Sequence, residues 1–261
     1  MTGWLAIAGL GPGAAQLITP EVTAALAEAT DLIGYAPYLA RVPARAGLTR
    51  HGSDNREELD RASLALRLAA QGKRVVVVSS GDPGVFAMAA AVFEAVDTGD
   101  PTWRDLDIRV LPGISAMFAA AARIGAPLGH DFCAINLSDN LKPWDLVERR
   151  LRLAAQADFV IALYNPLSSA RPWQLGRAFE LLREELPGTV PVVFASAVSD
   201  SREAIDTVTL RDAAASRADM RTLVLIGSSR TRLIARAGGK PSSIRRARPE
   251  SCRDRASAAP R

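Results

Sequence analysis

Short apolar runs alternate along the chain with longer segments in which apolar residues recur every three or four positions. The short runs predict buried strands, and the longer segments predict amphipathic helices. Strands that alternate with helices are typical of an α/β protein with largely parallel pairing. The predicted strands are Trp4–Gly9, Asp31–Tyr35, Arg74–Ser79, Ile108–Leu111, Phe132–Leu137, Phe159–Tyr164, Val190–Ala195, Ile205–Thr209 and Thr222–Ile226.

Local signals place the helices between these strands. Thr19 is predicted to cap a helix over Pro20–Ala29, since threonine is a favoured N-cap residue. Pro20 suits the first turn of this helix, because the N–H that proline lacks would have no partner there. Asp54 and Glu57 form a capping-box-like start to a second helix. Its predicted buried face consists of Leu59, Ala62, Leu66 and Ala69. The remaining predicted helices are Val85–Val96, Ile114–Ile124, Pro143–Ala155 and Pro172–Leu186.

The turn-rich segment 125–129 is the best internal boundary, because it separates two sets of alternating elements. We therefore predict two α/β domains, residues 1–124 and 125–239, with mostly parallel mixed sheets. Residues 240–261 are rich in proline, serine and arginine and lack an apolar period, so we predict a basic, disordered tail.

Three predicted strands each end in an unusual loop: Gly9–Gly13 (GLGPG), Ser79–Gly84 (SSGDPG) and Pro112–Ala116 (PGISA). Ligands bind an open α/β sheet beyond the carboxyl ends of its strands. Glycine permits positive φ and lets a ligand approach the main chain without a Cβ in the way. A single such loop could be a tight turn, but the three together predict a ligand site.

Composition narrows the class of protein. Of 261 residues, 48% are apolar and 23% are charged, which excludes a chain disordered throughout. Because no apolar stretch is long enough for a membrane span and no signal peptide opens the chain, we expect a cytoplasmic protein without a membrane partner. With only Cys133, Cys252, His51 and His130 as soft ligands, we expect no metal site. Both histidines are expected at exposed or capping positions.

The high pI of about 9.5 comes from the predicted tail. Residues 240–261 contain seven basic and two acidic residues, whereas the rest contains 25 basic and 26 acidic residues. A solvated extension is the favoured interpretation, with no nucleic-acid partner, and an arm that binds nucleic acid is the alternative.

The first loop also suggests a dinucleotide, since Gly9-x-Gly11-x-x-Ala14 fits the permissive Rossmann fingerprint. However, the expected helix begins only at Pro20, too late to aim its N-terminus at a pyrophosphate. The acidic residue expected at the end of the second strand is also missing, because Asp31 lies at its start. A nicotinamide-dependent oxidoreductase remains the remote alternative.

The three loops, in this order and spacing, resemble the tetrapyrrole methylase family, whose members use S-adenosylmethionine. Further motifs resemble its ring-contracting branch, the carbon-17 methyltransferases of cobalamin (corrin) synthesis, over residues 3–235. These motifs are Gly34-Tyr35-x-x-Tyr38, Ser80–Phe86, Leu137-Ser138-Asp139, Lys142-Pro143-Trp144, Ala162–Pro166 and Gly227–Arg230.

The resemblance implies a two-domain α/β enzyme, usually a homodimer, with the methyl donor in a cleft between the domains. S-adenosylhomocysteine would be one product, and a precorrin tetrapyrrole would be the substrate, either metal-free or containing cobalt. Carried over by motif, the donor contacts are Gly11, Pro12, Ser80, Gly81, Asp82, Val85, Ser115, Ala116 and Asn165.

The implied reaction moves a methyl group to carbon and contracts the macrocycle, which calls for oriented hydrogen bonds or an acid/base group. The candidates are Tyr35 and Asp139. The predicted substrate contacts are Tyr38, Tyr164 and Arg171. Arginine suits the carboxylates of such a substrate. The arginines of the segment 149–152 lie on one predicted helix and mostly form a solvated face.

Overall fold

The computed structural model describes residues 3–54, 57–168, 172–235, 237 and 243–246. The chain divides into two compact units, Met1–Ala116 and Met117–Arg261. We predicted this boundary eight residues later, at segment 125–129. The two-domain α/β organisation predicted from the alternating pattern is nevertheless present.

The first unit contains a five-stranded sheet in the order β3-β2-β4-β1-β5. Every neighbouring pair in this sheet is parallel. The strands are β1 (Trp4–Gly9), β2 (Asp31–Tyr35), β3 (Thr49–Ser53), β4 (Arg74–Ser79) and β5 (Asp107–Leu111). Strand β3 was not predicted, because its residues Thr-Arg-His-Gly-Ser carry no apolar signal and it lies at the edge of the sheet.

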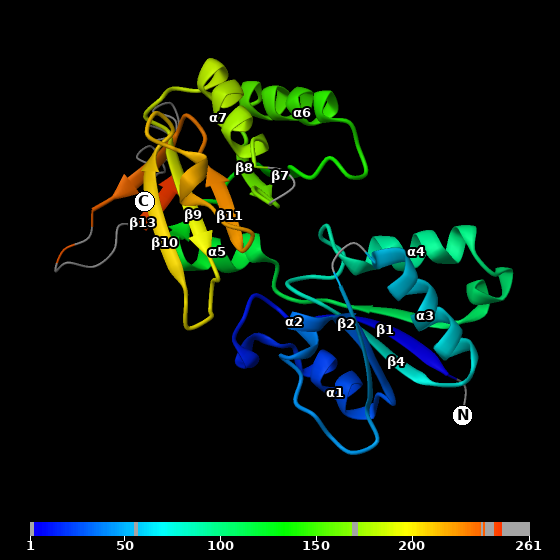
Figure 1. The fold of residues 1–261 in the computed structure, drawn as a ribbon. Coiled ribbons are helices and arrows are strands. Elements are labelled where there is room, and N and C mark those ends of the chain that lie inside the picture. Colours follow the sequence, from blue (N-terminus) through cyan, green and yellow to red (C-terminus); the bar gives the residue numbers. More distant parts are fainter. Residues whose placement is uncertain (1–2, 55–56, 169–171, 236, 238–242, 247–261) are drawn as a thin grey trace, which may run out of the picture. The chain divides into compact units, whose positions relative to one another are not determined.

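Helices cover both faces of this sheet (Figure 1). They are α1 (Pro20–Glu28), α2 (Ala36–Leu39), α3 (Glu58–Ala70) and α4 (Met88–Thr98), with 3₁₀ turns at Ala15–Leu17 and Pro101–Asp105. Leu5 and Ile7 of β1 share one core with α3 and α4. Trp4 and Ala6 pack in the opposite core with α1 and α2. This alternation is the period of a strand buried on both sides.

Capping explains where the helices begin. Thr19 Oγ1 accepts a hydrogen bond from Val22 N at 3.3 Å, which confirms the predicted cap of α1. Glu57 accepts from Asp54 N at 3.2 Å, and α3 begins at Glu58. The prediction that Leu59 is buried was wrong: this residue of the first turn of α3 is 49% exposed.

The second unit contains a mixed sheet in the order β10-β9-β11-β8-β7. Only β7 and β8 pair in parallel, and the other three pairs are antiparallel. The strands are β7 (Phe132–Asn136), β8 (Val160–Tyr164), β9 (Pro191–Ser196), β10 (Ala204–Thr209) and β11 (Thr222–Ile226). Helices α6 (Trp144–Gln156) and α7 (Gln174–Glu185) share a core with one face of this sheet. The unit also contains a 3₁₀ turn (Ala215–Arg217) and helix α5 (Ala116–Ile124), whose first residue is the last of the first unit.

A three-stranded sheet that was not predicted also belongs to the second unit. Strand β13 (Ser243–Arg246) lies between β12 (Thr231–Ile234) and β6 (Gly125–Ala126). The segment predicted as a domain boundary therefore pairs with part of the segment predicted as disordered, so both assignments are corrected here. Of the predicted tail, residues 240–242 and 247–261 lie outside the described residues.

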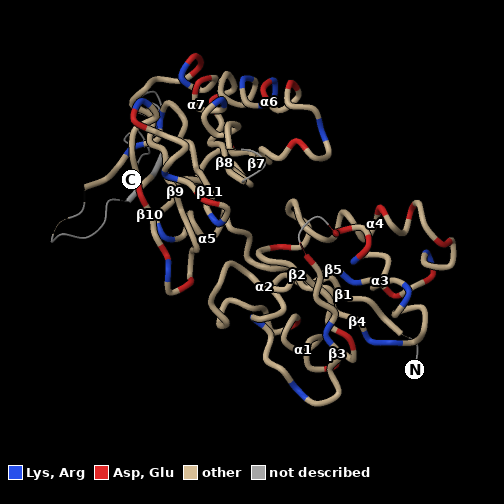
Figure 2. Tube along the Cα trace, viewed as in Figure 1, with Lys and Arg blue, Asp and Glu red and all other residues tan. Residues whose placement is uncertain are grey.

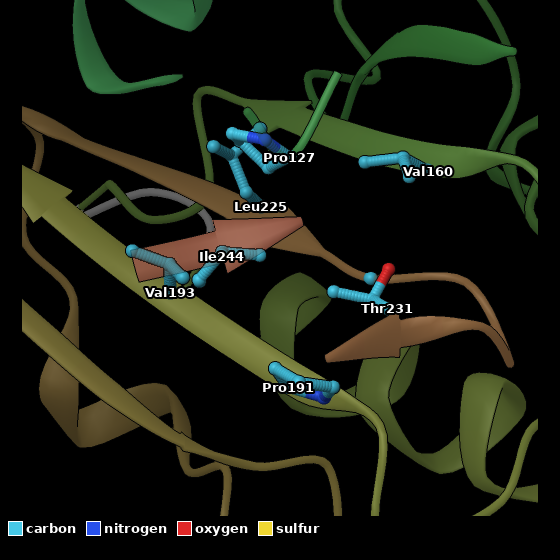
Figure 3. Close-up of a pocket in the computed structure, with 8 residues that line it drawn as sticks. Pro127, Val160, Pro191, Val193, Leu225, Thr231 and Ile244 are labelled. Atoms are coloured by element: carbon cyan, nitrogen blue, oxygen red, sulfur yellow. The ribbon is translucent and has the colours of Figure 1, made fainter. Parts of the chain in front are cut away.

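Ile244 of β13 explains why this strand docks. Its side chain is 3% exposed, and it lines an apolar pocket with Val193 and Leu225 of the main sheet and with Pro127 (Figure 3). The pocket has a volume of about 10 Å³, which is room for one water molecule and no ligand. It is a small packing defect between the two sheets of the unit.

We expect Ile244→Ala to lower the free energy of unfolding by about 2–5 kcal/mol, because it enlarges this cavity in the core. Urea unfolding followed by circular dichroism measures the change. Leu233→Ala in β12 is the matched control, since Leu233 is 50% exposed and should cost about 1 kcal/mol or less. Equal effects of the two substitutions would show that β13 does not contribute to the core.

Candidate functional site

The three glycine-rich loops meet at one edge of the first sheet. Strands β4, β1 and β5 are neighbours, and their carboxyl ends are aligned: Gly9 pairs with Ser79, and Ala8 pairs with Leu111. Tyr35 ends β2 next to β4 at the same edge. The sequence prediction of one loop cluster beyond the carboxyl ends of the strands agrees with this register.

The first and second loops are joined through their main chains. Gly11 N donates to Gly81 O at 3.1 Å, and Gly81 N donates to Gly11 O at 3.0 Å. Both residues have positive φ, 65° for Gly11 and 64° for Gly81, which a residue with a side chain adopts only with strain. These glycines therefore fix the pairing of the two loops.

The third loop packs so closely that only glycine fits. A Cβ on Gly113 would lie 2.2 Å from Gly81 O, and a Cβ on Gly9 would lie 2.6 Å from the same oxygen. We predicted that these glycines let a ligand approach the backbone. At Gly9 and Gly113 the backbone of a neighbouring loop occupies that space instead.

Asp82 ties the second loop to the third. Its Oδ1 accepts from Gly84 N at 2.8 Å, and its Oδ2 accepts from Gly113 N at 3.1 Å. Both carboxylate oxygens thus bind loop amides, which holds the loops together whether or not Asp82 also contacts a ligand. The other predicted contacts of this unit (Pro12, Ser80, Val85, Ser115 and Ala116) lie on the same three loops.

Two arginines that the sequence analysis missed stand beside this cluster. Arg41, just after α2, donates to three carbonyl oxygens of the first loop. Arg61 of α3 is 6% exposed and donates to Ser53 Oγ and Asp54 O, both at 2.8 Å. Neither residue lies in a glycine-rich motif, so composition and spacing gave no signal for them.

The two predicted tyrosines of this unit form an edge-to-face pair, with ring centroids 5.3 Å apart. Burial, and to a smaller extent Tyr35, raises the pKa of Tyr38 above its ordinary value, while Arg41 and Arg61 oppose the rise. Tyr38 is therefore a neutral phenol at physiological pH and can donate a hydrogen bond, but it cannot act as a base there.

The backbone is strained at Phe86, which follows the second loop. Phe86 has φ 52°, which is a true outlier for a bulky residue, and its ring is 47% exposed. Helix α4 begins at Met88 rather than at the predicted Val85, because residues 85–87 continue the loop. Strained residues of this kind cluster at functional sites.

Three of the predicted residues of the second unit lie at the ends of β7 and β8 or in the loops that follow these strands. Asn165 directly follows β8 and has φ 50°, and its side chain donates to Asn136 Oδ1 at 3.0 Å. The same oxygen accepts from Ser138 N at 2.8 Å, so it joins the loops that follow β7 and β8. Asp139 is half-buried in the first of these loops. Tyr164 Oη accepts from Met117 N at 3.1 Å, at the start of α5. Arg171 lies outside the described residues.

Other predicted polar residues have structural roles. His51 was expected at an exposed or capping position, but it lies in β3 and its Nε2 is 2.8 Å from Oδ1 of the buried Asp31. His130 is exposed, as expected, beside Asp131. Charged residues recur along α6 (Figure 2); Arg149 and Arg150 are exposed, as expected, and Arg152 bridges to Glu184 and Glu185 of α7.

The geometry does not favour a dinucleotide site. One 3₁₀ turn follows the first loop, and α1 begins only at Pro20, so no helix N-terminus opens inside the fingerprint. Within the described residues, no three His, Cys, Asp or Glu side chains gather as metal ligands would. None of the helices that the structure describes is long and apolar enough to cross a bilayer.

We expect Gly113→Ala to lower the free energy of unfolding by about 1–3 kcal/mol, because its methyl group collides with backbone that cannot move freely. Thermal and urea unfolding report the change. Gly176→Ala is the matched control: no atom lies within 4 Å of its Cβ position in α7, so it should stabilise the protein by up to about 1 kcal/mol. A stable Gly113→Ala protein would contradict the tight junction.

Cys133 of β7 should react slowly with alkylating agents, because burial raises the pKa of its thiol to about 11. In a Cys252→Ser background, the alkylation rate of the folded protein should keep rising with pH toward that value. The same thiol in urea should titrate near the ordinary value of about 8.5. Mass spectrometry follows the reaction, and a folded-state midpoint near 8.5 would contradict the burial.

Known proteins agree with this picture. A sequence profile of the Tetrapyrrole (Corrin/Porphyrin) Methylases matches residues 5–214. The chain is 59% identical to a precorrin-3B C(17)-methyltransferase of Sinorhizobium sp. over 91% of this chain and 94% of the relative. It is 38% identical to a probable cobalt-factor III C(17)-methyltransferase of Salmonella typhimurium, over 87% and 93% of the two chains.

Solved structures give the same result. The chain in the crystal structure of the methyltransferase CobJ has 60% sequence identity to this chain. The two structures superpose with a TM-score of 0.87, over 89% of this chain and 97% of that one. A uroporphyrin-III C-methyltransferase from Thermus thermophilus, complexed with S-adenosylhomocysteine, is 22% identical and shares the fold with a TM-score of 0.65, over 86% and 97%. The family predicted from the three loops is therefore confirmed: this chain belongs to the tetrapyrrole (corrin/porphyrin) methylases.

Proposed function

We propose that this protein transfers a methyl group from S-adenosylmethionine to carbon 17 of precorrin-3B, with contraction of the ring to give precorrin-4. The observation that carries this proposal is the 59% identity to a precorrin-3B C(17)-methyltransferase over nearly the whole of both chains. The cobalt-factor III relatives share 38% and 37% identity, which favours the metal-free substrate over the cobalt-containing one.

The loop cluster of the first unit suits the proposed methyl donor. A zwitterionic amino acid and a ribose diol need several donors and acceptors at close range, and main-chain groups with serine hydroxyls supply them. We assign donor binding to residues of the three loops and, in the second unit, to Asn165. The loop residues are Gly11, Pro12, Ser80, Gly81, Asp82, Val85, Ser115 and Ala116.

S-adenosylmethionine supplies an electrophilic methyl group when it is bound, and the carbon–sulfur bond breaks with its electron pair left on sulfur. Since positive charge disappears from the sulfur, alignment matters more than a base near it. The fixed loop junction provides such alignment, because its glycines and Asp82 leave the backbone little freedom.

The remaining roles follow the motifs. We assign proton transfer, or orientation of the hydroxyl that loses its proton, to Tyr35 and Asp139. Substrate contacts are assigned to Tyr38, Tyr164 and Arg171. Tyr38, kept neutral by its raised pKa, would donate a hydrogen bond to an oxygen of the macrocycle. We also infer a cytoplasmic homodimer that needs no nucleic-acid or membrane partner.

The direct test is anaerobic incubation of the protein with methyl-labelled donor and either precorrin-3B or its cobalt counterpart. We expect label in a ring-contracted product from precorrin-3B, detected by chromatography and mass spectrometry. Transfer to the cobalt counterpart alone would reassign the pathway. Binding of S-adenosylhomocysteine without transfer to either compound would keep the family and reject the substrate. Light scattering on the same sample tests the dimer.

A further inference from the structure

Arg41 makes an unusual set of bonds to the first glycine loop. Its Nη1 donates to Gly11 O at 3.1 Å, and its Nη2 donates to Gly13 O at 3.2 Å and also to Leu10 O. One guanidinium thus gathers three carbonyl oxygens of a four-residue stretch. A planar, multiply donating cation can do this, whereas the single ammonium of lysine cannot match the geometry.

The first loop has an intrinsic need for such a partner. It contains Gly11 and Gly13 around Pro12, so its backbone is conformationally free on either side of a rigid residue. Carbonyl oxygens that converge also repel one another unless a cation lies among them. The guanidinium of Arg41 restricts the backbone of the loop and also offsets the repulsion between its carbonyl oxygens.

The contact is connected to the loop junction. Gly11 O accepts from Arg41 and also from Gly81 N at 3.0 Å, so a single oxygen links the guanidinium to the second loop. Arg41 also affects Tyr38, whose pKa it lowers against the larger effect of burial. The side chain therefore binds the first of the proposed donor loops, and its charge acts on a proposed substrate contact of the same unit.

Neighbouring arginines in the same segment provide a comparison. Arg45 donates to Leu26 O and Ala29 O at the end of α1, and Arg50 donates to Leu39 O, at the end of α2, and to Val42 O beyond it. Both act as C-terminal caps, a common use of arginine. Arg41 has the same chemistry but is directed to the glycine loop.

We propose that Arg41 is a positioning residue of the methyl-donor site, which holds the first glycine loop in its binding conformation before the donor arrives. The inference rests on the proposed function, because it assumes that this loop binds S-adenosylmethionine. A loop that is ordered in advance spares the donor the entropy cost of ordering it. Loss of Arg41 should therefore weaken donor binding more than substrate binding.

The test compares Arg41→Ala, Arg41→Lys and Arg45→Ala. By calorimetry, we expect Arg41→Ala to weaken S-adenosylhomocysteine binding about tenfold or more, the equivalent of one or two lost hydrogen bonds. Its KM for the donor should rise more than its KM for the tetrapyrrole. Arg41→Lys should restore part of the affinity. Hydrogen exchange of residues 10–14 in the free protein should become faster in Arg41→Ala.

Arg45→Ala controls for general loss of stability, since it removes similar bonds to carbonyls away from the glycine loop. It should keep donor affinity within about twofold, although its melting temperature falls. A folded Arg41→Ala with wild-type donor affinity and exchange would overturn the inference. If Arg41→Ala does not fold, wild-type affinity in Arg41→Lys overturns it. If the wild-type protein itself binds no S-adenosylhomocysteine, the proposed function fails instead.

Discussion

The close contact of three main chains at the edge of the first sheet is the constraint on which the site depends. Gly81 O lies where a Cβ on either Gly9 or Gly113 would be, so the loops after β1, β4 and β5 touch backbone to backbone. Such contact requires three parallel strands that end in register, and the sheet order provides them. The hydrophobic core of this unit thus determines the site, because burial of β1 on both faces sets the register of its neighbours.

Polar side chains then hold the conformation of the loops, which packing of apolar residues alone does not determine. Asp82 binds two loop amides, Arg41 binds three loop carbonyls, and in the second unit Asn136 joins the loops after β7 and β8. Each group satisfies backbone atoms that have no partner within a regular strand or helix. A side chain that the sequence suggests as a ligand contact, such as that of Asp82, therefore also binds the protein's own backbone.

Sequence reasoning worked where a local period or a short motif carried the information. All nine predicted strands exist, and Thr19 caps α1 as predicted. It failed where pairing depends on distant residues. Strand β3 has no apolar pattern, and β6 and β13 become strands only because segments far apart in the chain meet. The loops identified the family, but Arg41 and Arg61 lie outside the glycine-rich loops and carried no signal of their own. The roles of Tyr35, Asp139 and Arg171 stay predictions.

The order of segments along the chain has a consequence for synthesis on the ribosome. The first unit is contiguous, Met1–Ala116, and carries its whole parallel sheet, so it can fold while later residues are still being translated. The second unit differs, because Ile244 of β13 covers apolar residues of β9 and β11 that are translated before it. Until β13 leaves the exit tunnel, that surface is uncovered and available to chaperones.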